Sequence, residues 1–312
     1  MKGILTFRPI QSPMNIARPA QTGDLVASTY RLEHVLGQGR SGIVFAARDR
    51  RSADRVAIKF LRRDLAYDRA AVEAFRNHAR VAAAIRSNEV CRAFELTESE
   101  SGVPCVVMEH LEGCDLSRDC AERVRYDVTE AASLIVQACA GLAAALQAGV
   151  VHADLKPSKL FVLAATRGTT RLKLLDLGGS ICASQPRAAT RQLSGSQAAL
   201  WQRSAEYAAP EQLDVEGLVD ARTNVWALGA ILYLLLCGRP PFDESTPQQL
   251  VAAIRSSDPP APRTLGVDIP EGLAQILSCA LSKSRAERFA SVTQLGEALA
   301  PYAVPRGPGA GY

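Results

Sequence analysis

Lysine is scarce in this 312-residue chain, although basic residues as a class are not. Of the 36 Lys and Arg residues only six are lysine, which leaves thirty arginines. The lysines are Lys2, Lys59, Lys156, Lys159, Lys173 and Lys283. A codon bias towards Arg and Ala is the simplest explanation, but the scarcity makes the position of each lysine more informative than usual.

A strong net charge is also missing. The 36 basic and 32 acidic residues leave a formal charge of +4, and no run of Lys and Arg forms a binding patch. We therefore expect no nucleic-acid partner. Apolar residues make up 47% of the chain and charged residues 22%, close to the globular average, which excludes wholesale disorder.

Paired cysteine motifs are absent. The eight cysteines are Cys91, Cys105, Cys114, Cys120, Cys139, Cys182, Cys237 and Cys279. None forms a C-x-x-C pair and no histidine lies at zinc-finger spacing, which argues against a zinc site. A chain of this length can build a core without disulfides, so we expect reduced thiols in a cytoplasmic protein.

Long uninterrupted apolar runs are missing as well. The uncharged run from Val225 to Cys237 has 13 residues, too few to cross a bilayer. The run from Leu134 to Val151 has 18 residues, but Gln and Gly interrupt it and its alanine content favours a core helix. The apolar run at the N-terminus is too short for a signal peptide. We therefore expect no membrane partner.

The residue pattern divides the chain into four parts. Residues 1–29 contain three prolines and no periodicity, which predicts a flexible leader. Residues 30–112 form one part and residues 113–302 another, because the predicted secondary structure changes at Gly113 from mostly β to largely helical. The Pro/Gly-rich residues 303–312 are expected to form a flexible tail.

The two central parts differ in their predicted secondary structure. Residues 30–112 contain short β-rich runs separated by turn residues, with apolar residues at helical spacing over 70–86. This pattern predicts a mostly antiparallel sheet with one helix. Residues 113–302 are predicted to be largely helical, with a short strand pair near 161–176. The helices are predicted over residues 129–148, 224–237, 246–256, 270–281 and 291–300.

Two motifs in the first part are typical of phosphate binding. Gly37-Gln-Gly39-Arg-Ser-Gly42 lies between two predicted strands, and glycines let backbone N–H groups approach phosphate oxygens. A structural glycine-rich hairpin is the alternative. Lys59 lies on the next apolar strand, where a lysine is costly to bury unless it meets an anion. The alternative for Lys59 is a lysine at a sheet edge.

Three further motifs follow in the second part. They are His152-Ala-Asp154-Leu-Lys156-Pro-Ser-Lys159, Asp176-Leu-Gly178 after an apolar strand, and Ala209-Pro-Glu211 before the apolar helix that opens at Asn224. Two carboxylates on loops at strand ends can hold Mg²⁺ and orient a hydroxyl nucleophile.

In this order, the five motifs resemble the signature of a bacterial-type (Hanks-type) serine/threonine protein kinase domain. The resemblance covers residues 30–302. It implies an α+β fold with two lobes, one a small antiparallel sheet with one main helix and the other larger and mostly helical. It also implies that ATP and Mg²⁺ are bound in the cleft between the lobes.

The resemblance assigns the nucleotide site residue by residue. The matching positions for binding are Gly37, Gly39, Gly42, Val44, Ala57, Lys59, Met108, Glu109, Leu111, Phe161 and Asp176. The glycines would cover the phosphates and Lys59 would contact the α- and β-phosphates. Val44 and Ala57 would pack above the adenine and Phe161 below it. Met108 would form the back wall of the pocket.

The backbone from Glu109 to Leu111 would hydrogen-bond the adenine edge, also by resemblance. The catalytic set would be Lys59, Asp154 and Lys156. Asp154 would accept or orient the substrate hydroxyl, and Lys156 would lie near the γ-phosphate. Asp176 would be the Mg²⁺ ligand.

Two positions break the family pattern where the chemistry depends on them. The helix after Lys59 carries His78 where the family has a glutamate that pairs with the lysine. Glu73 is five residues earlier and faces about 140° away on a helix, so we do not expect it to substitute. Lys159 replaces an asparagine that binds a second Mg²⁺, and lysine has no acceptor.

Milder departures surround the same motifs. Ala153 replaces an arginine that gathers a phosphorylated activation segment, which argues against activation through Thr190, Ser194 or Ser196. Asn224 replaces an aspartate that braces the catalytic loop, and its side-chain oxygen can still accept. Further substitutions are Leu177 for Phe and Arg203-Ser204-Ala205 for Gly-Thr-Pro.

The sequence therefore supports two functional hypotheses. In the first, the chain binds ATP but is a weak or inactive kinase, a pseudokinase that acts in signalling through a protein partner. In the second, it is an active serine/threonine kinase with altered metal use, in which the Lys159 ammonium stands in for a metal ion. Either way we expect ATP, with Mg²⁺ as a single ion or dispensable, and a protein substrate or signalling partner.

Overall fold

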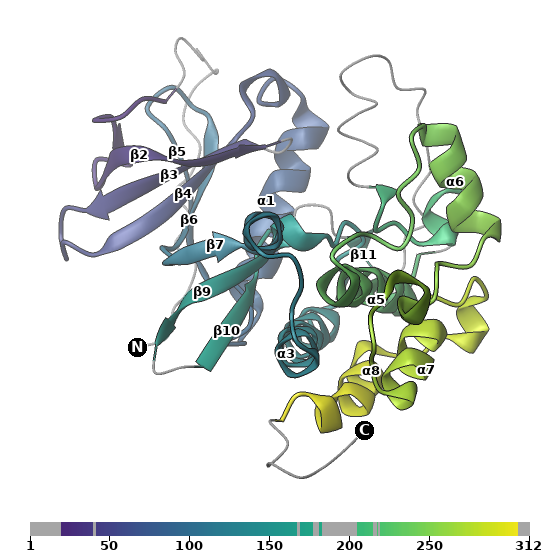
Figure 1. Ribbon diagram of the computed structural model, residues 1–312. Coiled ribbons are helices and arrows are strands. Elements are labelled where there is room, and N and C mark those ends of the chain that lie inside the picture. Colours follow the sequence, from purple (N-terminus) through teal and green to yellow (C-terminus); the bar gives the residue numbers. More distant parts are fainter. Residues whose placement is uncertain are drawn as a thin grey trace. The chain divides into compact units, whose positions relative to one another are not determined.

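The structure is a computed structural model (Figure 1) that describes residues 20–39, 42–166, 169–176, 181–182, 205–214, 217 and 219–304. The chain forms two compact units. The first unit contains the residues up to Arg86, Val90–Glu112 and Asp176. The second contains Ser87–Glu89, Gly113–Leu175 and the residues that follow the Asp176 segment.

A single antiparallel sheet dominates the first unit. Its strand order is β1-β2-β3-β4-β6-β5. The strands are β1 (Leu25–Val26), β2 (Tyr30–Gly39), β3 (Gly42–Asp49), β4 (Arg55–Leu61), β5 (Ala93–Glu98) and β6 (Pro104–Glu109). Tight polar turns fix the register: the Asp49 carboxylate accepts from the Arg51 N–H at 2.8 Å at the β3–β4 turn. The five longer strands lie within residues 30–112, where the sequence pattern predicts a mostly antiparallel sheet.

One helix, α1 (Arg69–Ala84), packs against this sheet. It begins at Asp68, whose carboxylate caps it by accepting from the Ala70 N–H at 2.9 Å. The helix buries Val72, Phe75 and Ala79 in the same apolar cluster as the sheet residues. These residues follow the helical spacing that predicted the element. A short 3₁₀ turn, η1 (Arg63–Leu65), joins β4 to the helix.

The first strand corrects the expected extent of the leader. Val26 is buried at 1% exposure, and β1 pairs with the start of β2 through Leu25–Arg31 and Val26–Tyr30. The expectation of a flexible leader is therefore wrong for residues 20–29. A two-residue strand is too short to show alternation, which is why the sequence pattern did not reveal it. Residues 1–19, and residues 305–312 of the expected tail, lie outside the described residues.

Helices make up most of the second unit. They are α2 (Leu116–Glu122), α3 (Val128–Gln147), α5 (Ala221–Cys237), α6 (Pro247–Ser256), α7 (Glu271–Ala280) and α8 (Val292–Leu299). The short 3₁₀ turns are η2 (Pro157–Lys159), η4 (Pro210–Gln212), η5 (Pro262–Leu265), η6 (Arg285–Glu287) and η7 (Ala300–Tyr302). Together with the sheet unit they confirm the predicted α+β class.

Two small sheets accompany the helices of the second unit. Strands β7 (Gly113–Asp115), β9 (Leu160–Thr166) and β10 (Thr169–Leu174) form one sheet in the order β10-β9-β7. Strands β8 (Val150–Val151) and β11 (Ile181–Cys182) pair in the other. The strand pair predicted near 161–176 is β9–β10, and these strands flank the loops that carry the second set of motifs.

Helices α3 and α5 form the core of the second unit. Of the 17 residues of α5, 14 are buried, so its uncharged run serves the interior of the unit. It begins at 221, three residues before the prediction, because Asp220 caps it by accepting from the Arg222 N–H at 2.8 Å. Helix α3 has the length and hydropathy of a membrane span, yet it packs on α5, α8 and β10, as a core helix does.

Candidate functional site

The three glycines lie at the turn between β2 and β3. Gly39 pairs with Gly42 and Gly37 with Val44. At Gly42 the backbone has φ +153°, and a Cβ there would lie 1.7 Å from the Phe60 carbonyl oxygen. No described atom lies within 4 Å of a Cβ built at Gly37 or Gly39. The sheet itself thus requires the glycine at 42, whereas nothing in the packing of the described residues requires the other two.

Strand register gathers four of the predicted nucleotide residues on one face of the sheet. Val44 on β3 lies opposite Lys59 on β4, and Met108 on β6 lies opposite Ala57. Ala57 and Lys59 are two residues apart on one strand, so their side chains point to the same side. Since paired residues of antiparallel strands share a face, Val44, Ala57, Lys59 and Met108 lie on the same surface.

Lys59 forms a close ion pair inside the first unit. Its Nζ lies 2.5 Å from Oδ1 of Asp176, and the two side chains are only 11% and 19% exposed. Asp176 has φ +54°, an uncommon value for a residue other than glycine. Such strained backbone is often found at functional sites. The structure therefore brings together the lysine and the metal-binding aspartate that the resemblance assigns.

The backbone N–H of Glu109, the last residue of β6, is already used in hydrogen bonding. The Glu109 N–H donates to the Arg92 carbonyl at 3.0 Å, and the Glu109 side chain accepts from the Arg92 N–H at 2.7 Å. The N–H of Glu109 is therefore already paired and does not serve the adenine edge. Leu111 is half-buried two residues further on. The expectation of adenine contacts from this backbone rests on the Glu109 carbonyl and on Leu111.

The helix α1 carries the first break in the family pattern. His78 is half-buried on this helix, between the buried Ala79 and the exposed Asn77. Glu73, the conceivable substitute, has a 55% exposed side chain and pairs with Arg80 at 3.3 Å. Glu73 therefore stays at the surface, which agrees with its helical phase.

The second unit holds the catalytic-loop residues. Asp154 Oδ1 lies 3.7 Å from the Lys156 ammonium, and both side chains are about one-fifth exposed (22% and 20%). The Asp154 N–H donates to the carbonyl of the fully buried His152 at 2.8 Å, which fixes the loop from the inside. Phe161 is half-buried on β9, where it pairs with Asp115 of β7.

The backbone of Lys159 joins the two loops of this unit. Its N–H donates to the Lys156 carbonyl at 2.8 Å, and its own carbonyl accepts from the Leu175 N–H at 2.7 Å. Position 159 thus sits between the catalytic loop and the residue before Asp176. The side chain at this position carries an ammonium group where the family has an amide.

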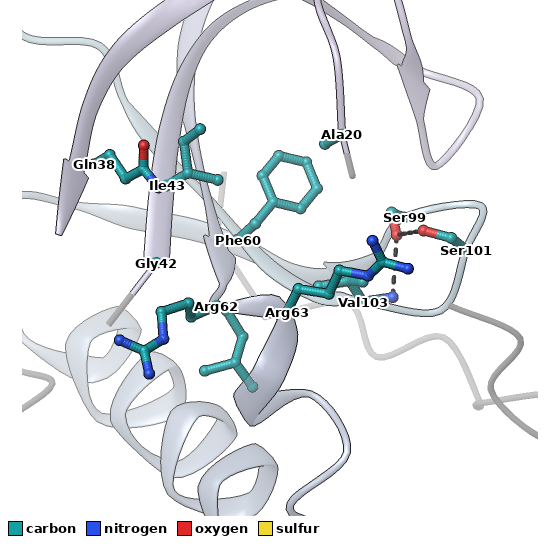
Figure 2. Close-up of a pocket in the computed structure, with 11 residues that line it drawn as sticks. Ala20, Gln38, Gly42, Ile43, Phe60, Arg62, Arg63, Ser99, Ser101 and Val103 are labelled. Carbon is teal, nitrogen blue, oxygen red and sulfur yellow. Dashed lines mark hydrogen bonds between the residues drawn. The ribbon is translucent and has the colours of Figure 1, made fainter. Parts of the chain in front are cut away.

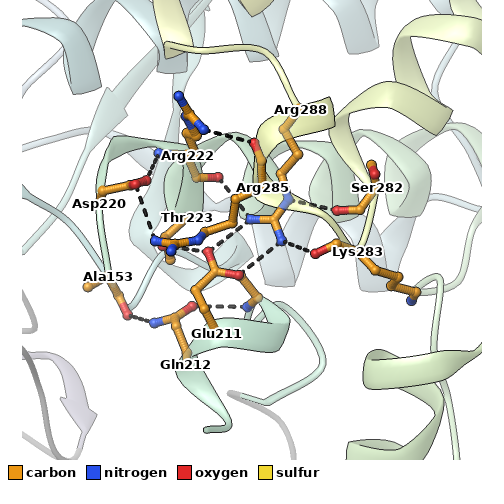
Figure 3. Close-up of polar contacts among 11 residues, drawn as sticks. Ala153, Glu211, Gln212, Asp220, Arg222, Thr223, Ser282, Lys283, Arg285 and Arg288 are labelled. Carbon is orange, nitrogen blue, oxygen red and sulfur yellow. Dashed lines mark hydrogen bonds and ion pairs between the residues drawn. The ribbon is translucent and has the colours of Figure 1, made fainter. Parts of the chain in front are cut away.

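The backbone at Ala153 is held by two side-chain amides. Ala153 has φ +54°, its N–H donates to Asn224 Oδ1 at 3.4 Å, and its carbonyl accepts from Gln212 Nε2 at 2.6 Å. Gln212 Oε1 in turn accepts from the Ala209 N–H at 3.0 Å, which fixes the amide orientation. The expectation that Asn224 can still accept from this loop is consistent with this contact. Figure 3 shows Gln212, a residue that sequence reasoning missed, reaching Ala153.

A buried ion pair anchors the Ala209-Pro-Glu211 motif. The Arg288 guanidinium donates to both carboxylate oxygens of Glu211 at 2.9 Å (Figure 3). The two side chains are 0% and 8% exposed, and the Thr223 hydroxyl also donates to Glu211 at 2.8 Å. Sequence reasoning singled out Glu211 but missed Arg288, because the two residues are 77 positions apart.

Several predicted positions fall outside the described residues. They are Leu177, Gly178, Thr190, Ser194, Ser196, Arg203 and Ser204. In the part of the chain that the structure describes, no group of three or more His, Cys, Asp or Glu side chains is arranged to hold a metal ion. A metal ion at this site would therefore need further ligands, such as phosphate oxygens, in addition to Asp176.

Comparison with known proteins gives one consistent result. The protein kinase domain model matches residues 30–298. The chain is 29% identical over 283 residues to the probable serine/threonine-protein kinase PknB of Corynebacterium glutamicum, covering 87% of this chain and 42% of that protein. It is 31% identical over 295 residues to the serine/threonine-protein kinase Pkn1 of Myxococcus xanthus, covering 94% of this chain and 41% of Pkn1.

The structural comparison agrees. The kinase domain of Mycobacterium tuberculosis PknI superposes with a TM-score of 0.68 at 25% identity, covering 91% of this chain and all of that domain. The chain spans about two-fifths of the length of the curated relatives it matches. The motifs, the fold and the matches lead to one conclusion: the chain belongs to the protein kinase domain family and is of the bacterial Hanks type.

Proposed function

We propose that this chain binds ATP and transfers its γ-phosphate weakly or not at all, and that it acts in signalling as a pseudokinase. The Lys59–Asp176 ion pair carries the binding half of the proposal. It places an ammonium and a carboxylate beside the face that holds Val44 and Ala57. A lysine this well buried is best explained by anionic partners, which the carboxylate and two phosphates would supply.

Mg²⁺ fits only part of this site. The Asp176 carboxylate is an oxygen ligand of the kind that Mg²⁺ prefers, and the ion would neutralise phosphate charge there. Lys159 has three donors and no acceptor, so it adds a charge where the family has a second ligand. We therefore propose that nucleotide binding uses a single ion, or needs Mg²⁺ less than it does in the family at large.

Two substitutions argue for weak transfer. His78 offers no anion to Lys59, and Lys159 removes a metal-binding oxygen. Lost positioning or charge stabilisation of this kind costs on the order of 10²–10³-fold in rate for each group, although the effects need not add. The loss concerns the transfer step more than binding, because the phosphate-binding residues are all present.

The alternative is an active serine/threonine kinase with altered metal use. The geometry of the catalytic loop favours it. Asp154 and Lys156 remain paired at 3.7 Å, and Ala153 is held by the Asn224 and Gln212 side chains. The residue that would orient a hydroxyl is thus kept in an ordered loop. The Lys159 ammonium would then replace part of the metal charge.

Two measurements on the same protein separate these possibilities. ATP should raise the melting temperature, by the equivalent of about 2.7 kcal/mol at 100 times Kd, and Lys59→Met should abolish the shift. Transfer of radiolabel to the chain itself and to a generic protein substrate should then be measured with Mg²⁺ and with Mn²⁺. Label that disappears in Asp154→Asn supports the active kinase. A melting shift without transfer supports the pseudokinase, and no shift with ATP contradicts both.

The role of Lys159 has its own test. ATP affinity should be measured for the wild type and for Lys159→Asn across a series from EDTA to excess Mg²⁺. We expect wild-type affinity to depend less on Mg²⁺, because the ammonium already supplies positive charge. Equal dependence in the two proteins contradicts this role. In a second comparison, the double variant His78→Glu with Lys159→Asn should show faster phosphoryl transfer, if these two substitutions are the main cause of weak activity.

The cellular setting belongs to the same proposal. The seven cysteines whose side chains the structure describes, all except Cys182, are free. Burial raises the pKa of Cys139 to about 12 and holds that of Cys105 well above its usual value, so these thiols stay protonated and resist oxidation. We place the domain in the reducing cytoplasm, with a protein substrate or signalling partner.

A further inference from the structure

Three arginines lie opposite one another across the sheet of the first unit. Arg31 on β2 pairs with Arg48 on β3, and Arg48 pairs with Arg55 on β4. Paired residues of neighbouring antiparallel strands share one face, so the three side chains form a row across the strands, and all three are exposed. We call them the arginine row. They are separated in sequence, so no run of basic residues reveals them.

The arginine row carries an excess of positive charge. Like charges that lie directly opposite each other destabilise a sheet. In the described part of the chain one carboxylate pairs with the row, since Glu33 Oε1 lies 2.9 Å from Arg48 Nε. The hydrogen bond from Arg48 lowers the pKa of the Glu33 carboxyl, and the charge of Arg55 lowers it further. Three arginines and one glutamate leave two positive charges in excess.

The middle arginine of the row is already oriented. Arg48 Nη1 donates to the Ala53 carbonyl at 3.0 Å, in addition to the contact with Glu33. By contrast, no described residue forms an ion pair or a side-chain hydrogen bond with Arg31 or Arg55. The row therefore has a fixed guanidinium at its centre, and the guanidinium groups on either side have donors available to a ligand.

Other arginines of this unit are neutralised within the chain. Arg62 lies at the opposite end of β4, beside a small pocket that Phe60 lines (Figure 2), and its guanidinium lies 2.5 Å from the Asp64 carboxylate. Arg76 on α1 is paired with Glu98 at 2.8 Å. The arginine row differs because two of its three members lack such a partner among the described residues, which marks this end of the sheet as a surface for an anionic ligand.

We propose that the arginine row binds an acidic segment of the chain's protein partner. Neighbouring strands lie about 4.8 Å apart, so the row spans about 10 Å. An extended segment presents alternate side chains on one face about 7 Å apart, so two or three carboxylates at alternate positions match the length of the row. Guanidinium groups bind such carboxylates through charge-assisted hydrogen bonds.

Carboxylates beside the row favour a peptide over a nucleic acid or an anionic membrane. Asp49 follows Arg48 and Asp54 precedes Arg55, and the Asp49 N–H donates to the Asp54 carbonyl at 2.9 Å, so both acids lie at the turn next to the row. A phosphate backbone or a layer of lipid headgroups is charged throughout and would meet these carboxylates. A peptide can place uncharged residues opposite them.

Fluorescence anisotropy with a labelled peptide provides the test. The probe is the peptide SETETES, and its control carries Gln in place of each Glu. R31E/R55E reverses two charges of the row and should weaken binding of the probe about tenfold or more, and R31Q/R55Q should give an intermediate affinity. The matched control R69E/R86E reverses two exposed arginines outside the row and should bind the probe within about twofold of wild type.

This proposal rests on the part of the proposed function that gives the chain a protein partner, and its failure is separable from a failure of ATP binding. R31E/R55E places carboxylates on both sides of Arg48, so its Tm should be no lower than that of wild type, and its melting shift with ATP should be retained. Discrimination between the two peptides without any ATP shift supports the row and contradicts ATP binding alone.

Three results overturn the proposal. The first is equal weakening of probe binding by R31E/R55E and R69E/R86E. The second is equal affinity of the wild type for the Glu and Gln peptides. The third is tighter binding of a single-stranded oligothymidylate or of phosphatidylserine vesicles than of the probe, lost in R31E/R55E, which would assign the row to a nucleic acid or a membrane instead.

Discussion

The buried pair between Arg288 and Glu211 allows a quantitative prediction for the second unit. In Arg288→Met, the Glu211 carboxylate stays in the interior with the Thr223 hydroxyl as a remaining donor. Breaking a buried ion pair by removing one partner costs about 3–5 kcal/mol, because an uncompensated charge is left behind. The Ser282 carbonyl also loses a donor at 2.7 Å. We therefore expect the free energy of unfolding to fall by about 4 kcal/mol.

Tryptophan fluorescence offers a local readout of this loss. Trp226 is fully buried, and the Arg288 guanidinium carbon lies 4.9 Å from its ring centroid. Urea unfolding followed through Trp226, in a Trp201→Phe background, reports on the unit that contains the pair. For a unit of this size, about 4 kcal/mol corresponds to a fall in Tm of roughly 10 °C.

Two further variants decide whether the ion pair is the cause. Arg285→Met breaks the partly exposed pair with Asp220, whose side chains are 34% and 46% exposed, and should cost less than about 1 kcal/mol. Replacing both partners, in Arg288→Met with Glu211→Leu, removes the stranded charge and should recover much of the loss. A cost under about 1 kcal/mol for Arg288→Met, or a double variant equal to the sum of the single ones, refutes the reasoning.

Two more predictions concern a titrating lysine and a glycine. Burial lowers the pKa of the half-buried Lys283 to about 8, although its position 4.2 Å from the Phe242 ring centroid favours the charged form. Above that pKa the unfolded chain binds a proton that the folded chain does not, so the free energy of unfolding should rise with pH. Relative to Lys283→Met, we expect a rise of roughly 1 kcal/mol between about pH 8 and 10.5, after allowing for solvent screening. Urea titrations at several pH values measure this difference, and a difference that does not change with pH contradicts the prediction. Gly42→Ala should lower Tm by several degrees because its Cβ meets the Phe60 carbonyl, whereas Gly39→Ala should change Tm by less than about 2 °C.

The fold was largely predictable because its longer elements carry clear sequence patterns. Strands β2 to β6 are β-rich runs of six to ten residues, and helix α1 keeps helical spacing over sixteen. The elements that were missed are short: β1, β7, β8 and β11 have two or three residues, and α2 has seven. Elements of this length depend on pairing and packing with distant residues, which a local pattern does not contain.

The sequence predicted those residues of the site that lie within recognisable motifs. Lys59 and Asp176 were assigned separately, and their ion pair links positions that are 117 residues apart, counted as 176 − 59. Arg288 and Gln212 were missed for a related reason. Each acts through a long-range contact, and neither lies at a position that its own local sequence marks out. Chemistry at a motif is visible in sequence, whereas the groups that hold a motif in place are not.

The catalytic loop shows how a substituted position can keep its geometry. Ala153 lacks the charge of the family's arginine, yet its backbone has a left-handed conformation that costs about 1–2 kcal/mol. Two neutral amides, from Asn224 and Gln212, bind its N–H and its carbonyl. Gln212 is itself held, because the neighbouring Glu211 is tied to Arg288 in the interior. The chain of contacts that places Asp154 therefore ends in a buried ion pair and contains no contact that depends on a charge at position 153.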